Sequence, residues 1–104
     1  MKKIKIAIFD TTLMVYLEDE KEAFQKHTGE MVKEGYYGFC CDNSIWIGTE
    51  KGISREQILL HELTHFVDWM IEDLLDIKSC CLWDTTELRA YSMQWLFGKV
   101  MRVI

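Results

Sequence analysis

The chain contains no proline and only six glycines among its 104 residues, and no segment has the composition of a linker. A long apolar run is also absent near the start, where the stretch after Met1-Lys2-Lys3 is interrupted by Lys5 and ends at Asp10. Such a stretch is too short for a signal peptide or a membrane-spanning helix. We therefore expect a single domain of residues 1–104, with a modest core and a cytoplasmic location.

Positive charge is the other scarce feature. The chain has 12 Lys and Arg residues against 17 Asp and Glu residues, which gives a formal net charge of −5, and it has no basic run. This balance argues against nucleic acid or an anionic membrane as a partner. By contrast, 49% of the residues are apolar and four are Trp, so the composition predicts a packed globular protein.

The four cysteines form two adjacent pairs, Cys40-Cys41 and Cys80-Cys81. This spacing is unlike a secreted disulfide framework and is consistent with a reducing compartment. A Cys₄ zinc site is disfavoured, because structural zinc sites usually use C-x₂₋₄-C and neighbours on a strand point to opposite faces. We interpret the cysteines as small buried hydrophobic residues, with a regulatory thiolate at an open metal position as the alternative.

Residues 61–65 read His61-Glu62-Leu63-Thr64-His65, an H-E-x-x-H pattern inside a run that is typical of an amphipathic helix. Two histidines four residues apart project from the same face of a helix, where both imidazoles can reach a single Zn²⁺. Glu62 leans toward that side and can take a proton from metal-bound water, whose pKa the ion lowers to about 7. The pattern therefore predicts a zinc site that generates a nucleophile at neutral pH.

The limits and the faces of this helix can also be predicted. Ser54 and Gln57 fit a capping box, so the helix is expected to run from about Ser54 to about Leu75. The two histidines share one side with Asp68 and Glu72, which lie too far along a straight helix to bind the same metal ion. We expect these two acids to be solvated or to support the ligands. The opposite side is predicted to face the core and carries Leu59, Leu63, Phe66, Val67, Met70 and Leu74.

A catalytic zinc site needs three protein ligands and one open position. Glu87 is the leading third ligand, because Asp84-Thr85-Thr86-Glu87 is predicted to open a further helix. Tyr91, Gln94 and Gly98 share its face and form a polar stripe that could oppose the histidines. Two alternatives remain open: Glu87 satisfies the helix start, and Tyr91 packs instead of stabilising an oxyanion. The positions predicted to pack are Leu88, Ser92, Leu96 and Val100.

The fold class predicted from the remaining segments is α+β. We expect a small N-terminal antiparallel sheet with a helix, followed by the histidine helix and a C-terminal helix that carries Glu87. Alternation of Ile4, Ile6 and Ile8 indicates a half-buried strand, and Asp42-Asn43-Ser44 indicates a hairpin turn. The predicted elements are strands near residues 4–8 and 13–18, a helix over residues 19–27, and a hairpin formed by residues 36–41 and 45–49.

The hairpin, the helix with His61-Glu62-Leu63-Thr64-His65 and the later helix with Glu87-Leu88-Arg89-Ala90 resemble the gluzincin metallopeptidases. The short length is similar to that of the stand-alone minigluzincins and of small phage or bacterial metallopeptidase domains. The resemblance covers residues 38–96 and implies a zincin-like domain. Its first motif is specific, whereas a glutamate on a later helix is a looser match.

What the resemblance implies is a peptidase in which Glu62 acts as general base and acid. Residues 45–49 would lie along the cleft, and their strand would bind an extended peptide or protein substrate by strand addition. The chain departs from the thermolysin-like pattern at Tyr91, where an Asp often orients the first zinc histidine, and it has no second domain. The implied zinc ligands are His61, His65 and Glu87.

A second hypothesis belongs to another class of function. The small size and the missing second domain favour a zinc-stabilised interaction or regulatory module whose hydrolytic site is latent. Residues 99–104, or a partner subunit in a homodimer, would then cover the cleft.

Overall fold

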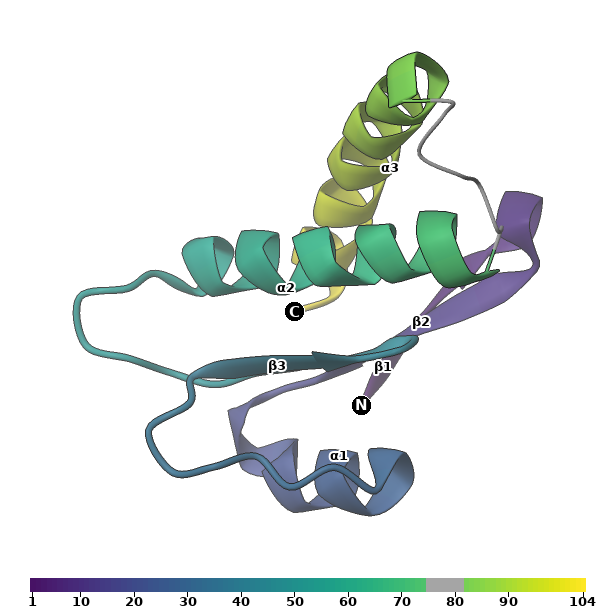
Figure 1. Cartoon of the computed structure of the whole chain (residues 1–104). Coiled ribbons are helices and arrows are strands. Elements are labelled where there is room, and N and C mark those ends of the chain that lie inside the picture. Colours follow the sequence, from purple (N-terminus) through teal and green to yellow (C-terminus); the bar gives the residue numbers. More distant parts are fainter. Residues whose placement is uncertain (75–81) are drawn as a thin grey trace.

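The structure is a computed structural model that describes residues 1–74 and 82–104 (Figure 1). Its secondary structure confirms the α+β class. The helices are α1 (Lys21–Thr28), α2 (Arg55–Trp69) and α3 (Leu82–Val103), with short 3₁₀ turns η1 (Ala7–Phe9) and η2 (Glu18–Glu20) and a π-helical turn η3 (Met70–Leu74). The strands are β1 (Lys2–Ile6), β2 (Thr11–Tyr16), β3 (Gly38–Cys41) and β4 (Ser44–Ile47).

The four strands form one sheet in the order β1-β2-β4-β3. Both predicted hairpins are present, because β1 pairs with β2 and β3 pairs with β4 in antiparallel fashion. The expectation of a purely antiparallel sheet is wrong, however, since β2 and β4 run parallel, with Val15 opposite Ile45. After β2 the chain passes through α1 and then forms β3 and β4. β4 lies between β2 and β3 in the sheet, so β3 is an outer strand.

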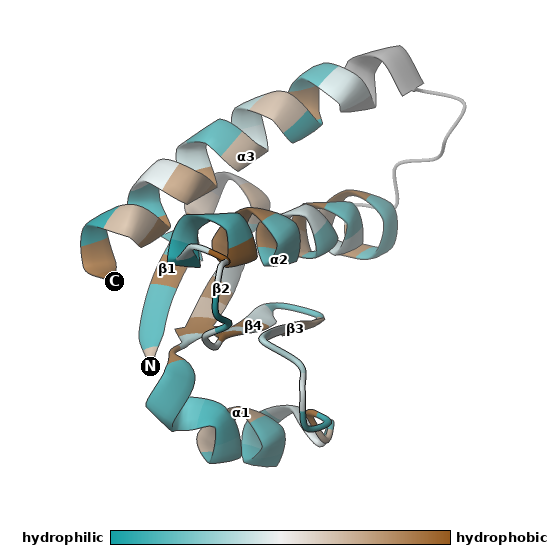
Figure 2. Ribbon diagram, turned by 90° about the vertical axis from the view of Figure 1, so that its left-hand side faces the viewer, coloured by the Kyte–Doolittle hydropathy of each residue, from teal (hydrophilic) through white to brown (hydrophobic). Residues whose placement is uncertain are grey.

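The helices cover both faces of the sheet (Figures 1 and 2). α2 packs on β3 and β4, and α3 packs on α2 and β1, whereas α1 contacts β2 and β4 from the other side. The main core lies between the sheet and α2, and a smaller cluster of Tyr16, Phe24, Val32 and Trp46 lies under α1. Within the described part of the chain, no helix is both long and apolar enough to span a membrane.

α2 begins where the capping box predicts. The Gln57 backbone N–H donates to Ser54 Oγ at 3.1 Å, and the Ser54 N–H donates to Gln57 Oε1 at 2.8 Å. The apolar side faces the core as expected, except that Leu74 is 42% exposed. It lies in η3, where the wider π-helical turn changes the angle between successive side chains, so a pattern laid out on a regular helix fails there.

Two local features at the start of the chain differ from the prediction. β1 ends at Ile6, and Ile8 lies in the 3₁₀ turn η1 instead of extending the strand. Asp10 then adopts the left-handed conformation, with φ of 49°, and turns the chain back into β2. The alternation of isoleucines therefore continues past the end of the strand that it indicates.

Cys40 and Cys41 are free thiols on opposite faces of β3. Cys40 packs against the main core and Cys41 against the smaller cluster, and both are partly buried. This placement agrees with their interpretation as small hydrophobic residues and keeps their two sulfurs apart. Cys80 and Cys81 lie outside the described residues.

Candidate metal centre

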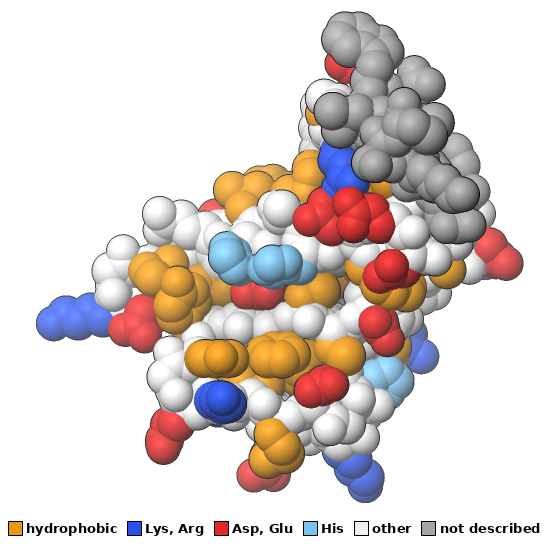
Figure 3. Space-filling model, viewed as in Figure 1, with side chains coloured by type: hydrophobic (Ala, Val, Ile, Leu, Met, Phe, Trp, Pro, Cys, Tyr) orange, Lys and Arg blue, Asp and Glu red, His pale blue; other side chains and the backbone are white. Residues whose placement is uncertain are grey.

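His61 and His65 lie side by side on the exposed face of α2, with their Nε2 atoms 3.3 Å apart. Figure 3 shows two adjacent histidine side chains in the middle of this face, with an acidic side chain directly beneath them. In a tetrahedral site, two nitrogens that each lie about 2.0–2.1 Å from zinc are separated by roughly 3.3–3.4 Å. The two imidazoles therefore already have the separation that a shared zinc ion requires.

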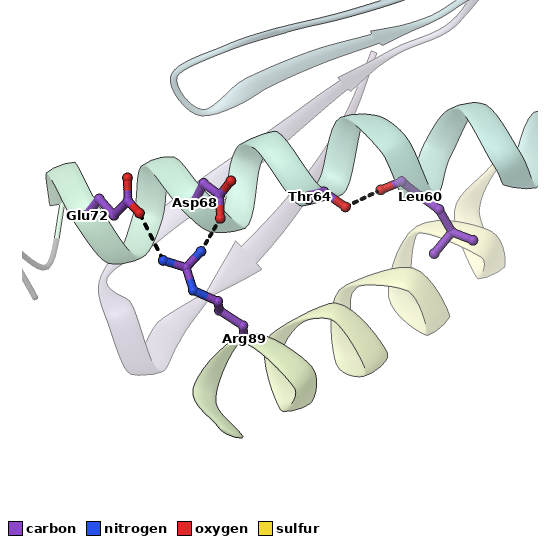
Figure 4. A network of polar contacts seen from close by, with 5 residues as sticks. All are labelled: Leu60, Thr64, Asp68, Glu72 and Arg89. Atoms are coloured by element: carbon purple, nitrogen blue, oxygen red, sulfur yellow. Dashed lines mark hydrogen bonds and ion pairs between the residues drawn. The ribbon is translucent and has the colours of Figure 1, made fainter. Parts of the chain in front are cut away.

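The underside of α2 fixes the direction of these imidazoles. Leu59, Leu63 and Phe66 have no exposed surface and anchor the helix on the sheet. Thr64, between the histidines, donates its hydroxyl to the Leu60 carbonyl at 2.8 Å (Figure 4). Each histidine follows a buried leucine by two residues, which is more than half a turn of the helix. The histidines are therefore held on the side opposite to the leucines.

Glu62 differs from the histidines because its side chain turns under the helix toward β3. Only 4% of its surface is exposed, and the described residues include no hydrogen-bond partner for it. Burial raises the pKa of its carboxyl group from 4.5 to about 7. Potential ligand atoms of Glu62, His61 and His65 all lie within 4.8 Å of one another. A group that exchanges its proton near neutral pH therefore lies next to the histidine pair.

A cavity of about 300 Å³ opens in front of these three side chains. β3 and the following turn line one side of it, and α2 lines the other. β3 is the outer strand of the sheet, whereas β4 pairs on both of its sides. The expectation that residues 45–49 lie along the cleft is therefore wrong, and β3 takes that place. The lining residues are Gly38, Phe39, Cys40, Asp42, His61, Glu62, His65 and Trp69.

The thiol of Cys40 is a further titratable group close to Glu62 in this cavity. Burial, followed by the negative charges of Glu62, Cys41 and Asp42, raises the pKa of Cys40 to about 12. In the metal-free chain the thiol is therefore protonated at neutral pH, which makes it a poor nucleophile. The alternative of a regulatory thiolate at the open metal position stays a prediction, since Cys40 borders the cavity but its thiol is protonated in the metal-free chain.

Glu87 is exposed and does not belong to the group formed by His61, Glu62 and His65. α3 begins at Leu82, two residues before the predicted start, so Glu87 lies in the second turn and cannot act as an N-terminal cap. Ser92, Leu96 and Val100 are buried as predicted. At 100° per residue these positions face the opposite direction from Glu87, so packing them turns Glu87 outward.

Tyr91 lies on the same outward side of α3 and is 66% exposed. It lines a second hollow of about 750 Å³ beside β1 and η1, together with Gln94, Trp95 and Gly98. The two hollows share no described residue. The expectation that the stripe of Glu87, Tyr91, Gln94 and Gly98 opposes the histidines is therefore wrong in this arrangement of α3.

Arg89 occupies the position facing α2 instead. Its guanidinium pairs with the Asp68 carboxylate, and its Nη2 donates to Glu72 Oε1 at 3.0 Å (Figure 4). Asp68 and Glu72 are therefore ion-paired rather than freely solvated, and they join α3 to the last turn of α2 and to η3. The sequence carries only a weak signal for this contact, since Asp68 and Glu72 lie four residues apart on one helix face, where a cation on another helix can reach both.

The C-terminal residues do not cover the cavity. α3 continues to Val103, and the Ile104 carbonyl accepts a hydrogen bond from Arg55 Nη1 at 3.2 Å. This contact lies at the start of α2, and no residue from 99 to 104 lines the cavity of the histidine pair. The expectation that residues 99–104 cover the cleft is therefore wrong in this arrangement.

No model of a known protein family, no curated protein and no solved structure matches this chain. Its function is therefore inferred from the chemistry of the site.

Proposed function

We propose that the protein is a small zinc-dependent metallopeptidase with a zincin-like arrangement of its site. The observation that carries this proposal is the 3.3 Å separation of the His61 and His65 Nε2 atoms, next to a buried carboxylate. Donor atoms at this separation fit one zinc ion, and in the metal-free chain the same two nitrogens are close enough to share a hydrogen bond.

In this proposal His61 and His65 hold the metal, and Glu62 moves the proton. When bound, zinc would supply a Lewis acid for the substrate carbonyl and would lower the pKa of a water molecule. Glu62 takes one proton from the attacking water and later gives it to the amine that leaves when the peptide C–N bond breaks. Burial raises the pKa of this carboxyl group to about 7 in the metal-free chain, and a general acid and base works best when its pKa lies near the working pH.

The third protein ligand in this proposal is Glu87. Since its carboxylate lies on the exposed side of α3, metal binding would have to rotate or shift the first turns of that helix. Such a movement would break the partly exposed ion pairs of Arg89 with Asp68 and Glu72, and it would also disturb the packing of the buried Leu96 and Val100. Exposed pairs contribute only about 0.2–1 kcal/mol each, so the larger cost of the movement would come from the buried apolar side chains, and metal coordination has to offset it.

The proposed substrate is an extended peptide that adds to the free edge of β3. Strand β3 lines the cavity and pairs only with β4 among the described strands. Main-chain hydrogen bonds along such an edge give affinity for a peptide of any sequence. Tyr36 stacks on Phe39 beside this edge, with ring centroids 6.1 Å apart, and offers an apolar contact to a side chain of the peptide.

Hydrolysis by Glu62→Gln protein tests the proposal. This substitution keeps the size of the side chain but removes its ability to accept the proton. We expect zinc binding to be retained and cleavage of an unstructured peptide mixture to fall at least about 100-fold. A Glu62→Gln protein that cleaves at the rate of the wild type would contradict the role of Glu62.

A latent zinc-stabilised module is the second candidate. The observation that favours it is that no tyrosine or arginine lines the cavity among the described residues, so an obvious oxyanion donor is lacking. A partner strand, including β3 of a second copy in a homodimer, would then occupy the edge. Zinc-dependent stability combined with no cleavage of any peptide would favour this candidate.

A further inference from the structure

Gly38 is the residue of β3 that lies directly under Glu62. Its φ angle is not among the positive values of the chain, so its backbone conformation is open to any residue. The space around Gly38, by contrast, is already filled by neighbouring side chains. A Cβ atom on Gly38 would overlap Glu62 Oε2, and would lie 3.1 Å from Glu62 Cδ and 3.0 Å from Ile58 Cγ2. Any side chain at this position therefore has to displace the end of Glu62, and this restriction comes from the neighbouring side chains and not from the backbone of Gly38.

Packing alone holds the Glu62 carboxylate in this place. The described residues include no hydrogen-bond or ion-pair partner for it, although it is 96% buried. The backbone of β3 closes one side, and Ile58, which is 1% exposed, closes another. The position of the carboxylate is therefore set by the shape of the space, and the missing side chain of Gly38 is part of that shape.

We propose that Gly38 is a positioning residue for Glu62, because its missing side chain leaves the space in which the carboxylate lies beside the histidine pair. The packing part of this inference is independent of activity. Its catalytic consequence rests on the proposed peptidase function, in which a displacement of about 1 Å costs roughly 100-fold in rate.

The strand and the glutamate differ in how easily they move. β3 is fixed by its antiparallel pairing, with Gly38 opposite Ile47, and by the hydrogen bond from the Gly48 N–H to the Tyr37 carbonyl at 2.8 Å. Glu62 Oε2 lies at the end of a flexible side chain. An added Cβ at position 38 therefore displaces the carboxylate and leaves the strand in place, so Gly38→Ala is expected to fold.

A double-mutant cycle on the metal-free protein tests the packing. Gly38→Ala should lower the ratio of folded to unfolded chain by roughly fivefold or more, because it overfills the space. In a Glu62→Ala background the same substitution should cause a clearly smaller loss, because only the contact with Ile58 Cγ2 at 3.0 Å remains. Gly98→Ala in α3 is the control, since no atom lies within 4 Å of its added Cβ, and it should act equally in both backgrounds. An equal loss from Gly38→Ala in both backgrounds would overturn the inference.

Zinc titration and peptide cleavage test the consequence. Gly38→Ala should bind Zn²⁺ within about threefold of the wild type, because both histidines are untouched, whereas kcat should fall about 100-fold. If the double-mutant cycle shows that positions 38 and 62 are coupled but the wild type cleaves no peptide, the packing is supported and the proposed function is rejected. Cleavage at the parental rate by Gly38→Ala would reject the positioning role and leave the proposed function standing.

Discussion

Three neighbouring side chains on one helix occupy different environments. His61 and His65 project into solvent, whereas Glu62 between them is buried against β3. Burial disfavours the charged form of a carboxyl group, which is why the pKa of Glu62 rises to about 7. The exposed imidazoles remain accessible to a metal ion, whereas only a small part of the Glu62 surface meets solvent. The H-E-x-x-H pattern predicted the three positions, but the burial of Glu62 depends on Gly38, for which the sequence gave no signal.

The raised pKa of Glu62 predicts how the stability of the metal-free protein depends on pH. Since the folded value of about 7 exceeds the ordinary 4.5, the contribution to stability is fully present below pH 4.5 and is lost as the pH rises to 7. Within this window the free energy of unfolding should fall by up to about 1.4 kcal/mol per pH unit from this group. Denaturant unfolding in the presence of a chelator measures it.

Glu62→Gln is the control for this dependence. The amide does not titrate, so its unfolding free energy should be flatter than that of the wild type between pH 4.5 and pH 7. Parallel profiles for the two proteins would show that Glu62 titrates at its ordinary value, and the account of its burial would be wrong.

At the scale of elements, signals confined to a few neighbouring residues were predicted correctly. The capping box of Ser54 and Gln57 fixed the start of α2, and turn residues at Asp42 and Asn43 separated β3 from β4. The rotation of α3 was not predicted. Either its apolar stripe or its Glu87 stripe can face α2, but not both. The apolar stripe does so, because removing Leu96 and Val100 from water is favourable.

Loss of the cap on α2 should be measurable. Ser54→Ala leaves the Gln57 backbone N–H without its acceptor, so the free energy of unfolding should fall by about 1 kcal/mol. Thermal or urea unfolding of the two proteins gives this value. Gln57→Ala, which removes the reciprocal bond, should cost a comparable or smaller amount. No change with Ser54→Ala would contradict the capping role.

The proposed rotation of α3 predicts the effect of removing Glu87. If Glu87 is the third ligand, Glu87→Ala should weaken zinc binding at least tenfold, in the range found for lost ligand interactions. Asp42→Ala is the matched control, because Asp42 is a carboxylate that lines the cavity in the present arrangement. Competition with a metal-binding dye measures both affinities. A loss with Asp42→Ala and none with Glu87→Ala would reject the rotation.

At the scale of the whole molecule, the order of the strands determines which strand lies beside the candidate site. Strand spacing and turns predicted both hairpins, but the parallel pairing of β2 with β4 joins residues about 30 positions apart and has no local signal. This pairing puts β4 inside and β3 outside. As a result the free edge, the cavity and the histidine pair face the same side of the molecule, which a single extended ligand could contact.

The zinc content of the purified protein tests the central claim most directly. After dialysis against a weak chelator, mass spectrometry should find about one zinc per chain in the wild type and little in His61→Ala or His65→Ala. His27→Ala should keep its zinc, because His27 lies on α1 and packs against Tyr16. A wild type without zinc even after zinc is added back, or equal zinc in all four proteins, would contradict a metal site at this histidine pair.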